Sequence, residues 1–400
     1  MRFRSVADLD VRSKRVLVRE DLNVPMRGGE IADYTRVDAA IATLALLRER
    51  GARTIVLSHL GRPDGKPDPA LSLRPLAAAL SERLGTPVAF AGDCVGDVAE
   101  RAVAELGDGG VALLENVRFH PEEERNDPEF AAALARLGDL YVNDAFGTAH
   151  RAHASTEGIA HLMSSAAGLL MQAELDALAR LVDNPRKPYV CAIGGAKVKD
   201  KIGVFTHLLD RVDAFCIGGG MANTFLAASG INVGRSLRDE DVDPARRIFE
   251  LAKQYHVDLH LPTDAVVASA FDAGDAAVVA ISDIGNGMIL DIGPGTARTY
   301  AEVIERAATI VFNGPMGVYE KPAYRRGTEI VGEAIEAATA RGAFSVVGGG
   351  DAAAAAHLLG FAGGVSHVST GGGATLEFLE GKTLPGVAVL EKSNAESRAS

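Results

Sequence analysis

The sequence of 400 residues contains no tryptophan, and aromatic residues make up only 5% of it. It has three cysteines, Cys94, Cys191 and Cys216, whose spacing is not that of metal ligands. Two of them lie in apolar runs, so we expect inert, buried thiols in a reducing compartment. The start of the chain lacks the apolar stretch of a signal peptide, and no apolar run has membrane-spanning length. These absences argue against a disulfide scaffold or a membrane protein, and we expect a cytoplasmic chain.

Positive charge is also scarce, because 41 lysines and arginines stand against 53 aspartates and glutamates, for a net charge of -12. This balance argues against nucleic acid as the main partner, and any anionic ligand must be met by local clusters of cations. A chain of 400 residues exceeds what one core usually fills, so we expect two domains. A hydrophobic content of 47% and a charged content of 24% are ordinary for a globular protein.

Short apolar runs alternate with helical patterns along the first half of the chain. The runs 15–18, 54–58, 111–114 and 140–142 predict strands, and the segments 39–50, 73–84, 98–106 and 128–137 predict helices between them. Apolar strands that alternate with helices favour a mostly parallel sheet covered on both faces. The scheme returns from residue 189 onward, so the predicted fold class is α/β, with two doubly wound parallel-sheet, Rossmann-like domains.

A helical pattern at 169–182, closed by the two prolines of Asn184-Pro-Arg-Lys-Pro188, predicts a bridge between the halves. We therefore expect an N-terminal domain at 1–168, an interdomain helix and hinge at 169–188, and a C-terminal domain at 189–383. We interpret 384–400 as a return to the first domain.

Four glycine clusters distinguish the second half. Each follows an apolar run and precedes a helical pattern; they are Gly194-Gly195, Gly218–Gly220, Gly348–Gly350 and Gly371–Gly373. Glycine lets backbone N–H groups approach a ligand, and a helix start adds partial positive charge, so each cluster can hold a phosphate. Tight strand-to-helix turns are the alternative for any one cluster. Four clusters in one half favour phosphate binding.

Arginine, histidine and polar residues follow each predicted strand of the first half. In open parallel sheets ligands collect beyond the carboxyl ends of the strands, and the arginine fork suits phosphate and carboxylate oxygens. A solvated surface side chain is the alternative for any single arginine. Their recurrence at four strand ends favours a site for a small, doubly anionic molecule. The residues are Arg19, Asp21, Asn23, Arg36, His59, Arg62, Arg118, His150 and Arg151.

The second half offers candidates for a nucleotide site. Lys197 and Lys201 are spaced i and i+4 after a glycine cluster, and we expect them on one face of a helix over 196–209, where they can contact successive phosphates. Asp351 can hold Mg²⁺ together with substrate phosphates, or it can be a helix N-cap. Asn313 and Glu320 share a loop, on which Glu320 can bind a ribose or simply be exposed.

These motifs, in this order, closely resemble the phosphoglycerate kinase family from end to end. The matching segments include Asp21-Leu-Asn-Val-Pro25, Ser58-His-Leu-Gly-Arg-Pro63 and Asn313-Gly-Pro-Met-Gly317. They also include 115–119, 145–155, 194–202, 218–222, 291–294, 348–351 and 369–374. The resemblance implies reversible phosphoryl transfer from 1,3-bisphosphoglycerate to MgADP, giving 3-phosphoglycerate and MgATP in glycolysis. It also implies a monomer whose partners are small molecules, with Mg²⁺ accompanying the nucleotide.

The resemblance assigns roles residue by residue. Phosphoglycerate would be bound by Asp21, Leu22, Asn23, Arg36, His59, Leu60, Gly61, Arg62, Arg118, His150 and Arg151. The nucleotide would be bound by Gly194, Lys197, Lys201, Gly218, Gly219, Asn313, Pro315, Glu320, Gly349, Gly350, Asp351 and Ala352, with Asp351 reaching the metal. The phosphoryl group in transfer would be surrounded by Arg36, Lys197, Lys201, Gly371, Gly372 and Gly373. Reactants on separate domains require closure, for which we expect hinges at 169–188 and near Ser369 and Thr370.

Some positions depart from the family pattern. Ala352 stands where the family usually has serine or threonine, Phe312 replaces the usual tryptophan, and Glu20 takes a normally apolar position and needs a partner.

Two rival interpretations remain open at this point. Another acyl-phosphate kinase, such as one acting on acetate, would leave the cationic strand ends with too much charge for its substrate. A catalytically inactive nucleotide-binding homologue has Ala352 as its best argument.

Overall fold

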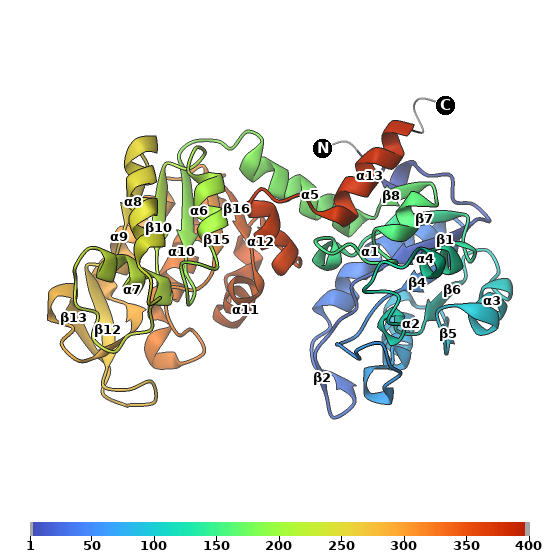
Figure 1. Ribbon diagram of the computed structural model, residues 1–400, viewed down its shortest axis with the longest axis horizontal. Helices are drawn as coiled ribbons and strands as arrows, with labels where there is room; N and C mark the ends of the chain where they lie inside the picture. The colour runs from blue at the N-terminus through green and yellow to red at the C-terminus, as the bar shows by residue number, and fades with distance from the viewer. Residues whose placement is uncertain (1–2, 397–400) are drawn as a thin grey trace. The chain divides into compact units, whose positions relative to one another are not determined.

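The computed structural model describes residues 3–396, which divide into two compact units (Figure 1). The N-terminal unit runs to Asp176 and resumes at Thr383, and the C-terminal unit is Ala177–Lys382. The division falls within α5 (Leu169–Val182), the helix expected as a bridge. Residues 1–2 and 397–400, which the sequence assigned to the N-terminal domain, lie outside the described residues.

The N-terminal unit is built on a six-stranded parallel sheet in the order β5-β6-β4-β1-β7-β8. The four strands predicted from apolar runs are confirmed, with bounds that differ by one residue at most. β5 and β8 escaped prediction because β5 is half exposed at the sheet edge and β8 is a three-residue strand. The strands are β1 (Arg15–Arg19), β4 (Arg53–Leu57), β5 (Val88–Ala91), β6 (Val111–Leu114), β7 (Leu140–Asn143) and β8 (Ser165–Ala167).

The four helices predicted in this unit also form, as α1 (Thr35–Glu49), α2 (Arg74–Leu84), α3 (Gly96–Ala104) and α4 (Pro128–Ala135). α1 starts four residues earlier than predicted, at a turn in which the Thr35 N–H donates to the Asp33 carboxylate at 2.7 Å. The earlier start places Arg36 in the first turn of the helix. A two-stranded hairpin, β2 (Met26–Arg27) and β3 (Glu30–Ile31), precedes it.

The C-terminal unit repeats the scheme with a second six-stranded parallel sheet in the order β11-β10-β9-β15-β16-β17. The predicted fold class, two doubly wound parallel-sheet domains, is thereby confirmed. A three-stranded antiparallel sheet, β13-β12-β14, was not predicted. The strands are β9 (Tyr189–Ile193), β10 (Ala214–Ile217), β11 (Asp258–His260), β12 (Asp264–Ala268), β13 (Ala277–Ala280), β14 (Met288–Ile292), β15 (Thr309–Asn313), β16 (Phe344–Val347) and β17 (His367–Val368).

Helices follow the parallel strands of this unit, and one of them corrects a prediction. The helix expected over 196–209 is only α6 (Ile202–Leu208), with Lys201 as its N-cap residue. The N–H groups of Val198 and Lys199 donate to the Asp239 carboxylate, at 2.7 and 3.4 Å, which holds the preceding segment outside the helix. The other helices are α7 (Gly219–Ala228), α8 (Asp243–Tyr255), α9 (Pro294–Glu305), α10 (Arg326–Ala340), α11 (Gly350–Leu359) and α12 (Gly373–Leu379).

The end of the chain forms α13 (Pro385–Glu396) and packs on the N-terminal unit. The Gly386 N–H donates to the Ala149 carbonyl at 2.9 Å, and the Asn143 side-chain amide donates to the Gly386 carbonyl at 3.3 Å. Across residues 3–396 no helix combines the length and the apolar character needed to cross a bilayer.

Candidate functional site

The first group of candidate residues lies in the N-terminal unit, in loops that leave the carboxyl edge of its sheet. The guanidinium of Arg36 forms an ion pair with the Asp21 carboxylate, whose other oxygen accepts the Asn23 N–H at 3.2 Å. The Asn23 side chain in turn accepts the Gly61 N–H at 2.8 Å. The loops after β1 and β4 are thus joined by hydrogen bonds through residues predicted to bind phosphoglycerate.

Arg118, after β6, extends this group of cations. It donates to the Gly61 carbonyl at 2.9 Å and forms an ion pair with Glu124 at 3.2 Å. Burial and the neighbouring Arg19 lower the pKa of its guanidinium, although it stays charged. A positive side chain that is 5% exposed and surrounded by other cations is stabilised by an anion.

His59 follows β4 and is buried with its Nδ1 3.2 Å from a guanidinium nitrogen of Arg19. Burial, followed by the charge of Arg19, lowers the pKa of His59 well below its usual value, so the ring is neutral. A neutral ring with one nitrogen facing Arg19 can offer the other to a ligand.

His150 and Arg151 follow β7, and the Arg151 Nε donates to His150 Nε2 at 3.3 Å. Arg62 is exposed, whereas Leu22 and Leu60 are buried in the core and can offer a ligand only their backbone groups. The structure thus brings the predicted phosphoglycerate residues to loops along one sheet edge, together with Arg36 from α1.

The second group of candidate residues lies in the C-terminal unit, around a cavity of about 540 Å³. Its wall is largely apolar, with Leu237, Met288, Leu290 and Val318 among the lining side chains, and Glu320 and Asp351 supply charge. A concave apolar wall with a few polar groups is the usual form of a small-molecule site. Four of the predicted nucleotide residues line it, namely Gly219, Pro315, Glu320 and Asp351.

The glycines beside this cavity have a packing role that their sequence does not reveal. A Cβ on Gly194 would lie 1.9 Å from the Pro315 carbonyl oxygen, and one on Gly218 would lie 2.5 Å from the Met316 sulfur. Gly194 and Gly218 thus allow the loop after β15 to pack against the ends of β9 and β10. These glycines therefore bring backbone against backbone beside the cavity, and their approach to a phosphate stays a prediction.

Lys201 is held by the backbone next to this cavity. Its Nζ donates to the Gly194 carbonyl at 2.7 Å and also to the Asn313 carbonyl. Burial lowers the pKa of Lys201 to about 8, while Cys191 and Asp351 act in the opposite direction. Lys197 lies before α6 and does not share a helical face with Lys201, which corrects the predicted arrangement.

The remaining predicted nucleotide residues lie around the ends of β15 and β16. Asn313 is buried, donates to the Gly348 carbonyl at 2.7 Å, and has a side-chain oxygen with no partner among the described residues. Gly349 is the N-cap of α11, so Gly350 and the exposed Asp351 lie in the first turn of that helix. Ala352 is 1% exposed and packs in the core of the unit.

The glycines predicted to contact the transferred group lead into α12. The Gly371 N–H donates to the Ser369 hydroxyl at 3.2 Å, and Gly372, with φ +52°, precedes the first helical residue, Gly373. The positive φ explains why glycine is needed at this turn.

Arg19, which the sequence places among the residues of the anion site, supports that site from the core together with Ser155 and Glu123, to which the sequence assigned no role. Arg19 is fully buried and donates to the Ser155 hydroxyl at 2.8 Å, and Ser155 donates to Glu123 at 2.6 Å. Burial raises the pKa of Glu123, and Arg19 opposes that shift. A glutamate in a loop carries no local signal of burial, so only the folded chain identifies this network.

Glu20, whose partner the sequence left open, lies beside Asp144. Both are buried, and within residues 3–396 neither Glu20 oxygen nor Asp144 Oδ2 has a hydrogen-bond partner. Burial and the Asp144 charge raise the pKa of Glu20 well above its usual value, and burial raises that of Asp144 to about 6. A protonated Glu20 can therefore donate to Asp144, whose Oδ1 accepts the Met171 N–H of α5 at 2.9 Å.

Two Rossmann-like units, one with a cationic sheet edge and one with a glycine-rich cavity, define a two-domain α/β phosphotransferase. The comparisons with known proteins identify which one. The phosphoglycerate kinase family model matches residues 6–382, so the chain belongs to the phosphoglycerate kinase family. Its members are glycolytic kinases that transfer a phosphoryl group to and from a carboxyl group.

Individual relatives agree along nearly the whole chain. The chain is 53% identical to the phosphoglycerate kinase of Moorella thermoacetica, over 96% of this chain and 98% of that protein. It is 51% identical to the phosphoglycerate kinase of Pelotomaculum thermopropionicum, over 98% of this chain and 100% of that protein. Among solved structures, the phosphoglycerate kinase from Coxiella burnetii has a TM-score of 0.90 at 42% identity, covering 98% of this chain and 99% of that chain. The enzyme from Pyrococcus horikoshii has a TM-score of 0.85 at 34% identity, covering 98% and 100%.

Proposed function

We propose that the N-terminal unit binds the phosphoglycerate and the C-terminal unit binds MgADP or MgATP. The observation that carries this assignment is the gathering of Arg36, Arg118 and Arg151, together with the neutral His59, in one unit along one sheet edge of an acidic protein. An acid with two anionic ends needs cations that are already held in position. Hydrogen bonds of Asn23 and Arg118 to Gly61 hold the loops after β1, β4 and β6 together, and Asp21 and Asn23 would orient the substrate hydroxyl and carboxylate.

In the C-terminal unit the apolar cavity would take the base of the nucleotide. Glu320 lines the cavity and is exposed, so its carboxylate can accept hydrogen bonds from ribose hydroxyls. Lys201 and Lys197 would contact the phosphates, with the N–H groups of Gly350 and Asp351 at the start of α11.

Asp351 suits a magnesium ion that accompanies the nucleotide. Its carboxylate is exposed, lines the cavity and, among the described side chains, forms no ion pair. Mg²⁺ takes oxygen ligands and is commonly bound through one carboxylate plus substrate phosphates. When bound there, the ion would neutralise phosphate charge.

The reaction requires that the two reactants be positioned and their negative charge compensated, and it does not require a general base. An acyl phosphate is a good donor, and the accepting ADP oxygen is already ionised. The phosphoryl group passes between two oxygens in line, with charge spread over its equatorial oxygens. We assign the stabilisation of that charge to Arg36, Lys197, Lys201 and the N–H groups of Gly371, Gly372 and Gly373.

Because the two reactants are assigned to different units, we propose that the units close on each other in the reaction. Closure would expel the water that otherwise hydrolyses the acyl phosphate. We place the hinges at 169–188 and near Ser369 and Thr370. We further propose that the enzyme is a cytoplasmic monomer, since each proposed binding group is formed by one chain and all three cysteines are free thiols.

A coupled assay with 3-phosphoglycerate and MgATP, followed by the loss of NADH, tests the proposal. We expect turnover with 3-phosphoglycerate, none with acetate, and a large loss for Arg36→Ala. Turnover on acetate alone would support a different acyl-phosphate kinase. Nucleotide binding without turnover on either acid would indicate an inactive homologue.

Asp351→Asn tests the metal assignment within the same assay. We expect a weaker affinity for MgADP and an unchanged affinity for metal-free ADP, both measured by calorimetry. Equal losses for the two ligands would contradict a role of Asp351 at the metal.

A further inference from the structure

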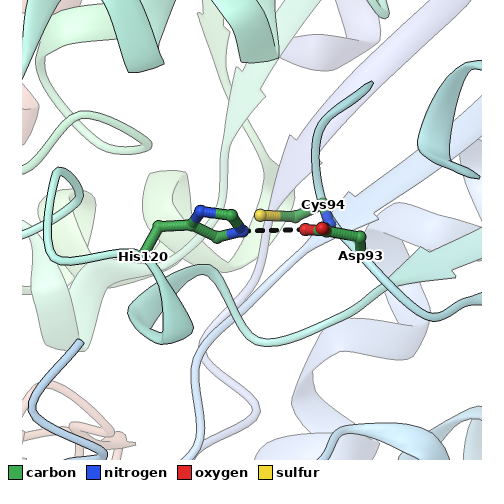
Figure 2. A group of neighbouring side chains, drawn as sticks. All are labelled: Asp93, Cys94 and His120. Atoms are coloured by element: carbon green, nitrogen blue, oxygen red, sulfur yellow. Dashed lines mark hydrogen bonds and ion pairs between the residues drawn. The ribbon is translucent and has the colours of Figure 1, made fainter. Parts of the chain in front are cut away.

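Three potential metal ligands meet at the carboxyl edge of the N-terminal sheet, beyond the ends of β5 and β6. Asp93 and Cys94 lie between β5 and α3, and His120 follows the short helix η3 (Val117–Phe119) after β6. β5 and β6 are parallel neighbours with Ala91 opposite Leu114, so both loops leave the same end of the sheet. Figure 2 shows the Cys94 sulfur and the Asp93 carboxylate on one side of the His120 ring.

The spacing of the three side chains suits a single ion. One ligand atom from each residue lies within 4.8 Å of the others, and His120 Nε2 is 2.8 Å from Asp93 Oδ1. Zinc bonds of about 2.0–2.3 Å in a tetrahedral site place ligand atoms roughly 3.3–3.8 Å apart. Small rotations of the three side chains therefore bring them to coordination distance.

Neighbouring contacts hold two of the ligands in place. The Asp93 Oδ1 atom accepts the Cys94 N–H at 2.7 Å, which orients the carboxylate toward the thiol. The His120 ring stacks on Phe130, with ring centroids 5.1 Å apart. Fixed orientation of ligands by surrounding groups is a general feature of metal sites.

The surroundings also favour a cation. Cys94 is fully buried, and its sulfur has no hydrogen-bond partner in the described part of the chain, whereas His120 and Asp93 are 29% and 43% exposed. The Asp93 carboxylate belongs to the cluster, and the carboxylates of Glu123 and Glu115 act electrostatically on the Cys94 sulfur. Their negative charge stabilises a divalent ion in this place, and such an ion can enter from the exposed side of the cluster.

We propose that Asp93, Cys94 and His120 form a binding site for a borderline-soft divalent cation such as Zn²⁺. The ion binds the Cys94 sulfur, His120 Nε2 and an Asp93 oxygen, with a water at the fourth position. The thiol proton passes to solvent as the sulfur–metal bond forms. The site is distinct from that of the nucleotide metal, because Mg²⁺ takes oxygen ligands and does not select thiolate or imidazole.

Such an ion bridges the loop after β5 to the loop after β6. The second loop carries Arg118, two residues before His120, which we assigned to phosphoglycerate. The bound ion therefore stabilises the N-terminal unit and holds the Arg118 segment to its neighbour. The thiol expected from the sequence to be inert becomes a ligand because folding brings it to a histidine from another loop.

Titration of the metal-free full-length enzyme with Co²⁺, without nucleotide, tests this proposal. We expect one equivalent to bind with a thiolate-to-cobalt charge-transfer band, and Zn²⁺ to displace it with loss of the band. Cys94→Ala should abolish the band, and His120→Gln should weaken binding at least 10–100-fold, the loss typical for even an outer partner of a metal site. Zn²⁺ should also raise the Tm of the parent protein and not that of the variants.

Matched variants keep the test decisive. Cys216→Ala removes another buried thiol, His161→Gln removes a histidine paired with a different acid, and Asp351→Asn removes the proposed nucleotide metal ligand. All three should keep the band. If Cys94→Ala does not fold, His120→Gln and Asp93→Asn carry the test. Co²⁺ binding with the parent affinity in both Asp93→Asn and His120→Gln, or no band in the parent protein, would overturn the proposal.

Discussion

The guanidinium of Arg36 forms an ion pair with the carboxylate of Asp21, and both residues belong to the proposed phosphoglycerate site. Arg36 is partly exposed in the first turn of α1, and its partner is nearly buried in the loop after β1. The pair holds the guanidinium in one orientation while leaving part of it accessible to an anion. An arginine oriented in this way needs little reorganisation when charge develops on a phosphoryl group.

Removal of Arg36 should therefore affect turnover more than folding. We expect Arg36→Ala to lower kcat by about 10³–10⁵, the range for cations at the transferred group in related reactions. Initial rates in the coupled assay give the value. Arg27→Ala removes an exposed arginine of the nearby hairpin and should leave kcat unchanged. A kcat for Arg36→Ala within a few-fold of the parent value would exclude Arg36 from the mechanism.

The buried Lys201 should give the enzyme an alkaline limit. Its pKa of about 8, lowered by burial, means that it loses its charge as pH rises through that value. We expect kcat/KM for MgATP to fall about tenfold per pH unit above it, measured at saturating 3-phosphoglycerate. Lys201→Arg keeps the charge at these pH values and should flatten the profile. If Lys201→Arg loses activity at the same alkaline pH as the parent protein, the loss is due to the titration of another group.

The same pKa of Lys201 should make the protein more stable as pH rises, whereas it makes the enzyme less active. Because its folded pKa lies below the unfolded value, the unfolded chain binds the extra proton between the two values. The free energy of unfolding therefore rises with pH between the folded and the unfolded pKa. Below the folded pKa it stays lower, by a constant amount, than it is above the unfolded pKa. Urea unfolding followed by circular dichroism should show this rise in the parent protein and lose it in Lys201→Met. The same slope in both proteins would contradict the assignment.

The Glu20–Asp144 pair should make the N-terminal unit less stable as pH rises. Burial raises the pKa of Glu20 in the folded state, so its contribution is fully present below the unfolded value and is lost as pH rises through the folded value. We expect Glu20→Gln, which keeps a donor for Asp144, to reduce the pH dependence by up to about 1.4 kcal/mol per pH unit. Urea unfolding between about pH 5 and pH 8 measures it.

The control for this experiment is Glu30→Gln, which changes an exposed glutamate of β3 and should leave the slope unchanged. A Glu20→Gln protein with the parent slope would show that Glu20 is ionised throughout, with a partner other than Asp144.

Packing beside the cavity of the C-terminal unit predicts a large effect of one added methyl group. Gly194→Ala would place a Cβ 1.9 Å from the Pro315 carbonyl oxygen, so the two loops must separate. We expect a loss of about 1–3 kcal/mol or more in unfolding free energy, together with weaker ADP binding. Gly274→Ala, where a Cβ meets nothing within 4 Å, is the matched control and should leave both unchanged. If Gly194→Ala binds ADP with the parent affinity, the contact between Gly194 and Pro315 is not needed for nucleotide binding.

Much of the fold could be predicted because the strands of a covered parallel sheet are continuous apolar runs. Val111–Leu114 is predicted with its observed bounds, since all four residues are buried. Prediction failed where a distant side chain decided the local conformation. Asp239 holds Val198 and Lys199 outside the helix that was predicted over 196–209. The edge strand Val88–Ala91 escaped because half-exposed residues lack a clear pattern.

The amino-acid sequence by itself determined the family, the α/β architecture and the set of residues that follow each strand, because parallel strands place those residues at one edge. Only the tertiary structure decided which of them touch. It paired Arg36 with Asp21, placed Glu20 beside Asp144, and brought Cys94 to His120 from the next loop. Each of these pairs joins different loops or helices of the fold, and in the Glu20–Asp144 pair burial raises the pKa of both carboxyl groups. Local patterns carry no information about such contacts, so their chemistry emerges only when the chain has folded.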